Sequence, residues 1–295
     1  MCLIGTMCNG TIVHSGLHPK EYLCAGKGEK SNIGYDTSDF SSRVEETFSK
    51  ETADGWDEKS KFVTYHGAKN PIMDEVMMNV KNGMSILDVG CGTGKLISRI
   101  DKKIENSYLI GLDISNDMIE HARNKVSKGN NEVSFIADDF IKHDFKSSKF
   151  DIIIFSNVLH HVSDPIQALE CAKKLLSDDG IILFSVPGAN YLSETFEPKD
   201  LSNRYSVKEM DEIVTKAGLY SVCASRKNFL MTFDSYEMYV EYLKSIGTYQ
   251  KIIGYTNEKW SDEFNKKILE RFSKSTCITG EYLTYSCKDR SKILV

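Results

Sequence analysis

The chain has 295 residues, 41% of them hydrophobic and 27% charged, which is typical of a soluble globular protein and argues against a disordered or fibrous chain. Its 37 basic and 42 acidic residues leave a formal net charge of −5, so no general positive field attracts nucleic acid or an anionic membrane. Eight cysteines without a repeating spacing argue against a zinc knuckle or a secreted disulfide framework.

The beginning of the chain shows no targeting signal. Residues 1–7 are apolar, but no basic residue precedes them and the run is too short for the core of a signal peptide. No stretch approaches the roughly 20 apolar residues that a membrane-spanning helix needs. We therefore expect a cytoplasmic protein without a membrane partner.

Two segments precede the regular part of the chain. Residues 1–40 are rich in Gly, Ser, Asn and Cys and have neither helical nor strand periodicity, so we expect a loosely structured extension. Apolar residues then recur at helical spacings, among them Phe48, Trp56 and Phe62. This pattern predicts a helical cap over residues 41–84.

Between residues 85 and 186, short apolar runs alternate with amphipathic segments. The apolar runs predict strands over 85–89, 108–113, 133–137, 150–156 and 180–186. The amphipathic segments predict helices over 94–102, 116–128 and 165–176. This alternation predicts a doubly wound α/β fold, a mostly parallel sheet with helices on both faces. Such sheets bind ligands beyond the carboxyl ends of their strands.

The rhythm changes after residue 186. Ser206 and Glu209 form the pattern of a capping box, which predicts a helix ending at Gly218, and a strand over 219–229 follows. Residues 233–275 are helical and rich in aromatic side chains, and a final strand over 281–287 has no helix after it. We expect the last two strands to pair antiparallel at the sheet edge, with the helical segment inserted between them.

The first predicted strand runs into three glycines at alternate positions, Gly90, Gly92 and Gly94, and then into a helix. Glycine lets the backbone turn tightly and lets a ligand approach the main chain, so a nucleotide site is predicted. Dinucleotide sites place the third glycine three residues after the second and seat a pyrophosphate on the helix. Here the spacing is shorter, and the Asp88 carboxylate would repel that anion but attract an ammonium group. A cationic, phosphate-free nucleoside fits better.

Two further strand ends carry acidic residues. Asp113 ends the next strand about 20 residues after the glycines, where a carboxylate can accept both ribose hydroxyls. Asp138 ends the third strand, where it can accept a hydrogen bond from an adenine amine, with Phe140 as an apolar neighbour of the ring. Singly, these residues have ordinary explanations, such as a glycine turn or a cap by Asp113 of the helix near Ser115. Their shared order favours one nucleoside site.

Together these motifs resemble those of the class I S-adenosylmethionine-dependent methyltransferases, over roughly residues 48–289. The resemblance implies that the glycines line the methionine and ribose, that Asp113 holds the ribose, that Asp138 holds the adenine amine, and that the end of the fourth strand forms the floor. The cofactor-binding residues that it implies are Asp88, Gly90, Cys91, Gly92, Gly94, Asp113, Ile114, Asp138, Asp139, Phe140, Ser156 and Asn157.

The same resemblance implies a domain organisation. A Rossmann-like methyltransferase domain would comprise residues 85–232 and 276–295, with seven strands of which the last is antiparallel. The helical lid of residues 233–275 would lie between the last two strands. No metal ion is implied.

The loop after the fourth strand contains His160 and His161, and in the resembling family this loop faces the transferable methyl group. An unperturbed histidine titrates near pH 6.5, so either could accept a proton from an incoming hydroxyl or amine. Alternatively, both histidines hydrogen-bond the loop or cap the next helix. The loop lacks the Asn/Asp-Pro-Pro-Tyr-like run of enzymes that methylate base amines, which with the acidic charge disfavours nucleic acid as acceptor.

The region from 229 to 275 resembles the lid of methyltransferases that act on small carboxylic acids, such as trans-aconitate and juvenile hormone acid methyltransferases. Phe233 and Tyr236 are candidates for an apolar wall around the acceptor, or for ordinary helix packing. Arg204, Tyr205 and a histidine of the loop after the fourth strand are candidate donors to an acceptor carboxylate.

The predicted activity is therefore the transfer of a methyl group from S-adenosylmethionine, by in-line displacement, to an O or N atom of a small, partly apolar molecule. A carboxylate acceptor is already ionised and needs no base, whereas an amine or hydroxyl would need His160. Two alternatives remain at this point. The acceptor could be a peptide or protein, with residues 1–40 as a docking arm, or the chain could be a regulatory protein that binds the cofactor without turnover.

Overall fold

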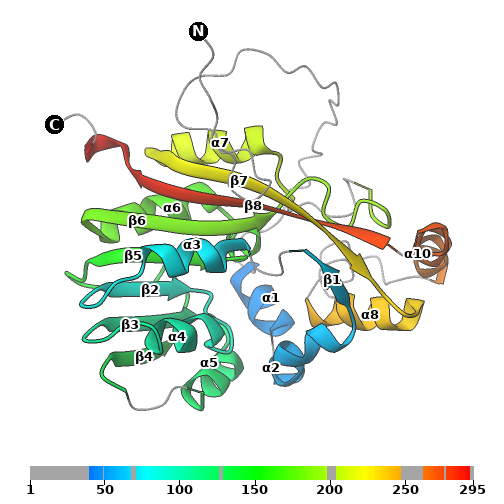
Figure 1. The fold of residues 1–295 in the computed structure, drawn as a ribbon, viewed down its shortest axis with the longest axis horizontal. Coiled ribbons are helices and arrows are strands. Elements are labelled where there is room, and N and C mark those ends of the chain that lie inside the picture. The colour runs from blue at the N-terminus through cyan, green and yellow to red at the C-terminus, as the bar shows by residue number, and fades with distance from the viewer. Residues whose placement is uncertain are drawn as a thin grey trace, which may run out of the picture.

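The computed structural model describes residues 40–48, 50–67, 71–125, 129–197, 204–246, 262–275 and 277–292. Nearly all of the predicted extension, and residues 247–261 of the predicted lid, lie outside these ranges. The described strands form one sheet in the order β1-β7-β8-β6-β5-β2-β3-β4 (Figure 1). None of the helices in the described ranges combines the length and the apolar character that a bilayer crossing requires.

Five parallel strands form the middle and one side of the sheet, and β2 pairs with both β3 and β5. Their bounds are Ser85–Val89 for β2, Tyr108–Asp113 for β3, Glu132–Ala137 for β4, Phe150–Ser156 for β5 and Leu176–Pro187 for β6. These strands begin and end within a residue or two of the predicted positions, except that β6 begins earlier. The predicted parallel sheet is confirmed.

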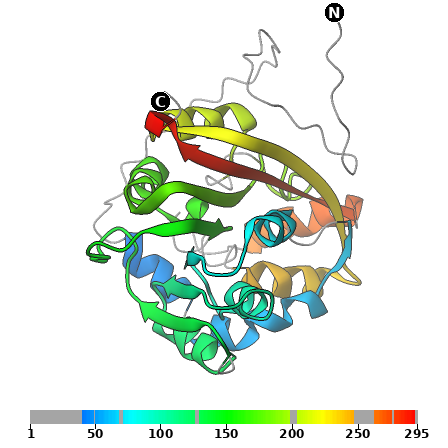
Figure 2. The ribbon, with the colours of Figure 1, turned by 60° about the vertical axis from the view of Figure 1, so that its left-hand side comes forward.

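Helices cover both faces of the sheet, as the doubly wound fold requires (Figure 2). Consecutive residues of each strand serve opposite faces: Ile86 packs with helices α3 and α4, whereas Leu87 belongs to the cluster that contains α6 and α7. The helix bounds are Pro71–Asn79 for α3, Lys95–Asp101 for α4, Asn116–Arg123 for α5, Pro165–Leu175 for α6 and Val207–Lys216 for α7. The predicted capping box is present at the start of α7, between Ser206 and Glu209.

The last two strands, β7 (Leu219–Thr232) and β8 (Cys277–Asp289), pair antiparallel, and β8 is also antiparallel to β6. The antiparallel pairing is as predicted, but both strands extend further toward the lid. The sheet has eight strands rather than the expected seven, because β1 (Thr64–His66) pairs antiparallel with the end of β7. The three residues of β1 pair with some of the backbone hydrogen-bonding groups on the otherwise open edge of β7. The periodicity of the sequence alone does not reveal this pairing.

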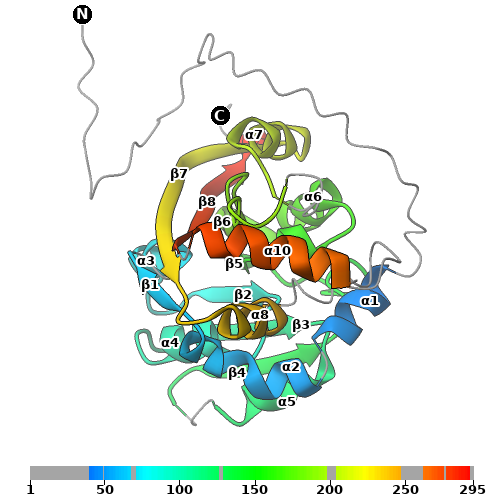
Figure 3. The ribbon, with the colours of Figure 1, turned by 90° about the vertical axis from the view of Figure 1, so that its right-hand side faces the viewer.

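Two groups of helices lie beyond the carboxyl ends of the parallel strands (Figures 1 and 3). The N-terminal group consists of α1 (Phe40–Thr47), α2 (Lys50–Gly55) and the 3₁₀ helix η2 (Trp56–Lys61). The second group, α8 (Tyr236–Ser245) and α10 (Asp262–Lys274), connects β7 to β8. This second group has its own apolar core, in which the rings of Tyr239 and Phe272 stack at 5.0 Å.

The first turn after β2 is packed tightly against the loop after β5. Gly90 has a φ of +67°, and a Cβ at this position would lie 2.3 Å from Cγ2 of Val158. Any larger residue at Gly90 therefore meets both backbone strain and a steric clash. The absence of a side chain at Gly90 thus allows the turn after β2 to pack directly against the loop after β5, at the centre of the carboxyl edge.

Gly90→Ala is expected to lower the free energy of unfolding more than Gly83→Ala does. Gly83 also has a positive φ, +80°, but nothing lies within 4 Å of its Cβ position, so the control isolates the backbone strain of about 1–2 kcal/mol. The clash adds a further cost of about 1–3 kcal/mol at Gly90. Urea unfolding measures both variants.

The double variant Gly90→Ala/Val158→Ala relieves the clash but keeps the backbone strain. Relative to Val158→Ala alone, it should therefore lose about as much stability as Gly83→Ala. Equal losses for Gly90→Ala and Gly83→Ala would contradict the packing of these two loops.

Candidate functional site

Asp88, near the carboxyl end of β2, is a buried carboxylate at the centre of the sheet edge. Asp88 is 1% exposed, and its Oδ1 accepts no hydrogen bond from the described residues. Burial, and to a lesser extent the charge of Asp113, raise the pKa of Asp88 well above its usual range. A carboxylate in this position is costly to ionise unless a positive group lies beside it.

Asp113, at the end of β3, binds the glycine turn directly. Its Oδ2 accepts a hydrogen bond from the Gly92 amide at 2.8 Å, and its Oδ1 accepts one from the Ser115 amide at 3.0 Å. Burial raises the pKa of Asp113, although backbone hydrogen bonds from Ser115, Gly92 and Ile114 act in the opposite direction. Each carboxylate oxygen can accept a second hydrogen bond, so Asp113 can hold the turn and a ligand together.

Asp113 is not the cap of the helix that follows. The N-cap of α5 is Ser115, whose side chain accepts a hydrogen bond from the Met118 amide. The Ser115 hydroxyl in turn donates to the carbonyl of Phe48 at 2.6 Å. The ordinary explanation of Asp113 as a helix cap is therefore wrong, and the N-terminal helices are tied to this strand end.

The third strand end, after β4, carries Asp138, Asp139 and Phe140. The Asp138 side chain is 44% exposed and accepts a hydrogen bond from Nδ1 of His143 at 2.7 Å. This hydrogen bond, more than any other cause, lowers the pKa of Asp138. Asp139 accepts a hydrogen bond from the amide of the second residue after it. Phe140 is buried in the main core.

The end of β5 turns sharply at Asn157, which has a φ of +59°. Its amide donates to the carbonyl of Ser185 in β6, and the Ser185 hydroxyl donates to Oδ1 of Asn157 at 3.0 Å. Ser156, in register with Ser185, is half-buried at the same edge. The predicted floor residues are thus fixed by the neighbouring strand, and Asn157 is an asparagine that tolerates the left-handed conformation.

His160 and His161 lie on the short 3₁₀ helix η3 (Leu159–His161), with ring centroids 4.0 Å apart. Neither caps the next helix, because the Asp164 side chain accepts the amide hydrogen bonds at the start of α6. The His161 ring packs edge-on against Phe48 at 5.1 Å. The histidine loop therefore contacts the N-terminal helices, which local sequence patterns do not indicate.

The N-terminal helices also contact the glycine turn. Phe48 packs against Trp56 at 5.5 Å, and Nε1 of Trp56 lies 3.6 Å from the position that a Cβ on Gly92 would take. The Thr93 hydroxyl donates to Asp57 at 3.0 Å, and Asp57 also forms an ion pair with Lys125, just after α5. These residues were not predicted as site residues; only the helical spacing of the aromatic side chains pointed to a cap.

Cys91 is buried beside the turn, where burial raises its thiol pKa well above the usual range, so it is a packing residue rather than a nucleophile. Gly94 precedes α4 with a φ of +72°. Within the described ranges, no three His, Cys, Asp or Glu side chains gather as ligands for a metal ion.

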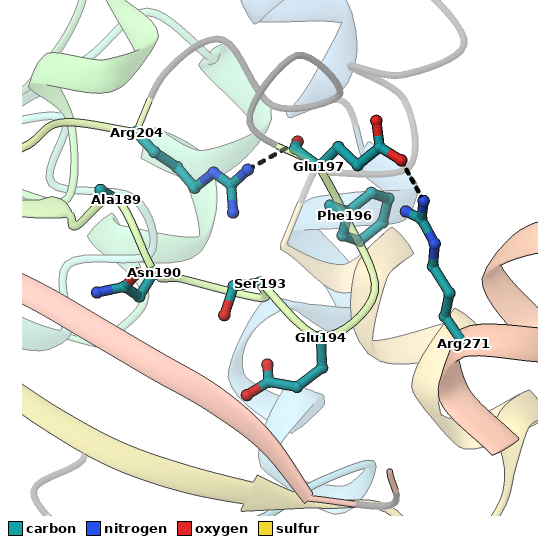
Figure 4. Close-up of a pocket in the computed structure, with 8 residues that line it drawn as sticks. All are labelled: Ala189, Asn190, Ser193, Glu194, Phe196, Glu197, Arg204 and Arg271. Atoms are coloured by element: carbon teal, nitrogen blue, oxygen red, sulfur yellow. Dashed lines mark hydrogen bonds and ion pairs between the residues drawn. The ribbon is translucent and has the colours of Figure 1, made fainter. Parts of the chain in front are cut away.

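A cleft of about 350 Å³ opens beside the loop that follows β6 (Figure 4). Arg204 reaches into its wall and donates to the carbonyls of Tyr191 and Glu197, at 2.5 and 2.8 Å. Arg271 of α10 forms an ion pair with the Glu197 carboxylate on the other side. The cleft is lined by Ala189, Asn190, Ser193, Glu194, Phe196, Glu197, Arg204 and Arg271.

The other predicted substrate residues lie around the lid and the main core. Phe233 is buried in the lid core, and Tyr236 donates from its hydroxyl to Oδ1 of Asn265 in α10 at 2.5 Å. Tyr205 packs against the main core, where burial raises its pKa to about 12. Phe233 and Tyr236 thus hold the lid helices together, as the packing alternative expected.

Comparison with known proteins agrees with this geometry. The model of a methyltransferase domain family matches residues 80–246. The ubiquinone biosynthesis O-methyltransferase of Actinobacillus pleuropneumoniae is 29% identical over 47% of this chain, and the match covers 61% of that enzyme's length. The malonyl-[acyl-carrier protein] O-methyltransferase 1 of Ilyobacter polytropus is 27% identical over 72% of this chain and 82% of its own.

The fold is also shared with solved structures. A Bacillus halodurans protein superimposes with a TM-score of 0.53 over 76% of this chain and 99% of its own, at 14% identity. YcgJ of Bacillus subtilis gives a TM-score of 0.50 at 18% identity, over 74% of this chain and 97% of its own. At these identities the likeness concerns the fold alone.

The site residues fit the cofactor of this family. The glycine turn adjoins a buried carboxylate whose Oδ1 accepts no hydrogen bond from the described residues, and S-adenosylmethionine carries positive charge on its sulfonium and ammonium groups. The family model covers more than half of the chain, and the described sheet has the predicted parallel strands and antiparallel last pair. The chain therefore belongs to the methyltransferase domain family.

Proposed function

We propose that this chain is a class I, S-adenosylmethionine-dependent methyltransferase that methylates an oxygen atom of a small, partly apolar acceptor, and that the acceptor group is a carboxylate. The observation that carries this proposal is the cleft beside β6, which has Arg204 in one wall and Arg271 in another. Guanidinium groups attract carboxylates, and an acceptor carboxylate would share Arg204 with the carbonyls of Tyr191 and Glu197 and would compete with the Glu197 carboxylate for Arg271. Two of the relatives are named as O-methyltransferases, one of them acting on a malonyl group, which supports an oxygen acceptor.

In the proposed site, the carboxyl edge of the sheet divides into a donor half and an acceptor half. The donor half comprises the ends of β2, β3 and β4, where Asp88 would face the positive amino-acid part, Asp113 the ribose and Asp138 the adenine. The acceptor half lies past β5, where the cleft opens. His160 and Asn157 follow β5, between the two halves.

S-adenosylmethionine supplies an electrophilic methyl group on a sulfonium. The protein chiefly has to hold donor and acceptor in line and to exclude water, since proximity and orientation account for most of such a rate enhancement. Phe48 and Trp56 are placed to exclude water above the glycine turn. A carboxylate acceptor is already an anion at neutral pH, so no group needs to remove a proton from it.

Binding of the cofactor is expected to strengthen as the pH rises. Burial raises the pKa of Asp88 well above its usual 3.8, and burial also raises the pKa of Asp113. At a pH below these raised pKa values the ligand-free protein carries a proton on these groups, and a cation binds best once that proton has left. Calorimetric affinities for S-adenosylmethionine should rise as the pH passes from the usual aspartate range to the raised pKa values, by at most about tenfold per pH unit for each proton released.

Asp88→Asn removes one of the two groups, so this rise should become shallower, whereas Asp144→Asn, at an exposed turn residue, should leave it unchanged. The stability of the ligand-free protein changes with pH in the opposite direction to the cofactor affinity. A raised folded pKa favours the protonated form, so the free energy of unfolding falls as the pH rises through the folded pKa. An affinity independent of pH, or the same slope in Asp88→Asn, would contradict the proposed carboxylate contacts.

His160→Ala separates a carboxylate acceptor from an amine or hydroxyl acceptor. For a carboxylate, we expect turnover to fall by less than about tenfold with an unchanged affinity for S-adenosylhomocysteine, because no general base is needed. For an amine or hydroxyl, loss of the base would cost about 10² to 10⁴ in rate. Steady-state kinetics on the best acceptor measure the difference, and a loss in the second range would contradict the carboxylate proposal.

The overall proposal is tested by incubating the enzyme with S-adenosylmethionine labelled in its methyl group and a panel of small acids, phenols, amines and peptides. We expect label in base-labile methyl esters of small acids. Label only in peptides would favour a protein acceptor, and binding without any product would favour the regulatory alternative.

A further inference from the structure

His143 lies beside the predicted adenine end of the site and has no role in the function described so far. Its Nδ1 is 2.7 Å from Oδ2 of Asp138, and both side chains are partly exposed, at 22% and 44%. A carboxylate can only accept, so Nδ1 carries the proton and donates it to Asp138. The His143 ring is therefore the group that fixes one oxygen of this carboxylate.

The position of the imidazole is itself fixed by the fold. The His143 amide donates to the carbonyl of Asp139 at 2.9 Å, which closes a tight turn after β4. The ring packs edge-on against Phe145, with centroids 4.6 Å apart, and Phe145 is buried in the main core. The imidazole is thus anchored to the core on one side and to the turn on the other.

The other oxygen of Asp138 is fixed as well, because its Oδ1 accepts a hydrogen bond from the Asp139 amide at 2.8 Å. Together these contacts hold the carboxylate in one orientation, and the histidine hydrogen bond lowers the pKa of Asp138 and so keeps it ionised. An ionised carboxylate is a stronger acceptor than a neutral acid, and each oxygen can still accept one more hydrogen bond.

We propose that His143 is a positioning residue for cofactor recognition: it holds the Asp138 carboxylate in the orientation that accepts the adenine amine, and so contributes to the preference for adenine over a base with a carbonyl at that position. The proposal rests on the adenine contact of Asp138 in the proposed function. His143 need not touch the cofactor.

The test compares two ligands that differ at this edge of the purine, in the group on C6 and in the hydrogen that N1 carries when C6 is a carbonyl. S-adenosylhomocysteine has an amine on the purine, and S-inosylhomocysteine has a carbonyl oxygen, which a carboxylate repels. The affinity ratio of the two, measured by calorimetry, reports recognition of the amine. We expect His143→Ala to lower this ratio by about threefold to fivefold, the scale of a partly exposed charged pair. We expect His143→Asn, whose amide nitrogen can replace Nδ1, to keep most of it.

The matched control is His121→Ala, which removes another partly exposed histidine that bonds an aspartate, Asp54, at 2.9 Å. This control should leave the ratio unchanged. A purely structural role of His143 would weaken both ligands equally and leave the ratio as it is, which would overturn the proposal, as would failure of His143→Asn to restore it.

The Asp138→Asn variant separates the role of His143 from the adenine contact of Asp138. If the ratio falls in this variant but not in His143→Ala, only the role of His143 is wrong. If the ratio stays unchanged in Asp138→Asn, the adenine contact is wrong and the role of His143 falls with it. If the unmodified enzyme binds neither ligand, the proposed function itself fails.

Discussion

Two buried aspartates, Asp88 and Asp113, lie at the carboxyl edge of the sheet, and their negative charge needs compensating partners. Transferring a carboxylate out of water costs several kcal/mol unless partners compensate for it. Backbone amides partly compensate Asp113, and this is why its carboxylate also shapes the glycine turn through Gly92. Asp88 lacks such a donor at Oδ1 among the described residues. A positively charged ligand is the natural partner, so binding and ionisation of this pair are coupled.

The geometry around that pair depends on close contacts between loops. Val158 occupies the space that a side chain on Gly90 would need, so the turn after β2 and the loop after β5 are in direct contact. The histidine loop then meets the N-terminal helices through His161 and Phe48. The proposed donor half of the site would therefore be assembled from segments that are distant in sequence, the N-terminal helices as well as the strand ends.

The acceptor half is built differently. The long antiparallel pair β7 and β8 extends past the parallel strands and carries α8 and α10, whose aromatic side chains form a core separate from the main one. Tyr239 and Phe272 are used in that packing. The polar cleft lies where the loop after β6 meets α10. A lid with its own core can differ in its acceptor chemistry without disturbing the cofactor half of the sheet.

The sequence alone determined the parallel sheet, the antiparallel pair and the position of Asp88, Asp113 and Asp138 at or next to the ends of parallel strands. The reason is that strand and helix periods, glycine spacing and strand-end residues are local properties of the chain. Only the tertiary structure decided the pairing of β1 with β7, the contact of His143 with Asp138, and the engagement of Arg204 with loop carbonyls. These features join groups whose pairing depends on how turns and loops fold in space, and no local period encodes such a contact.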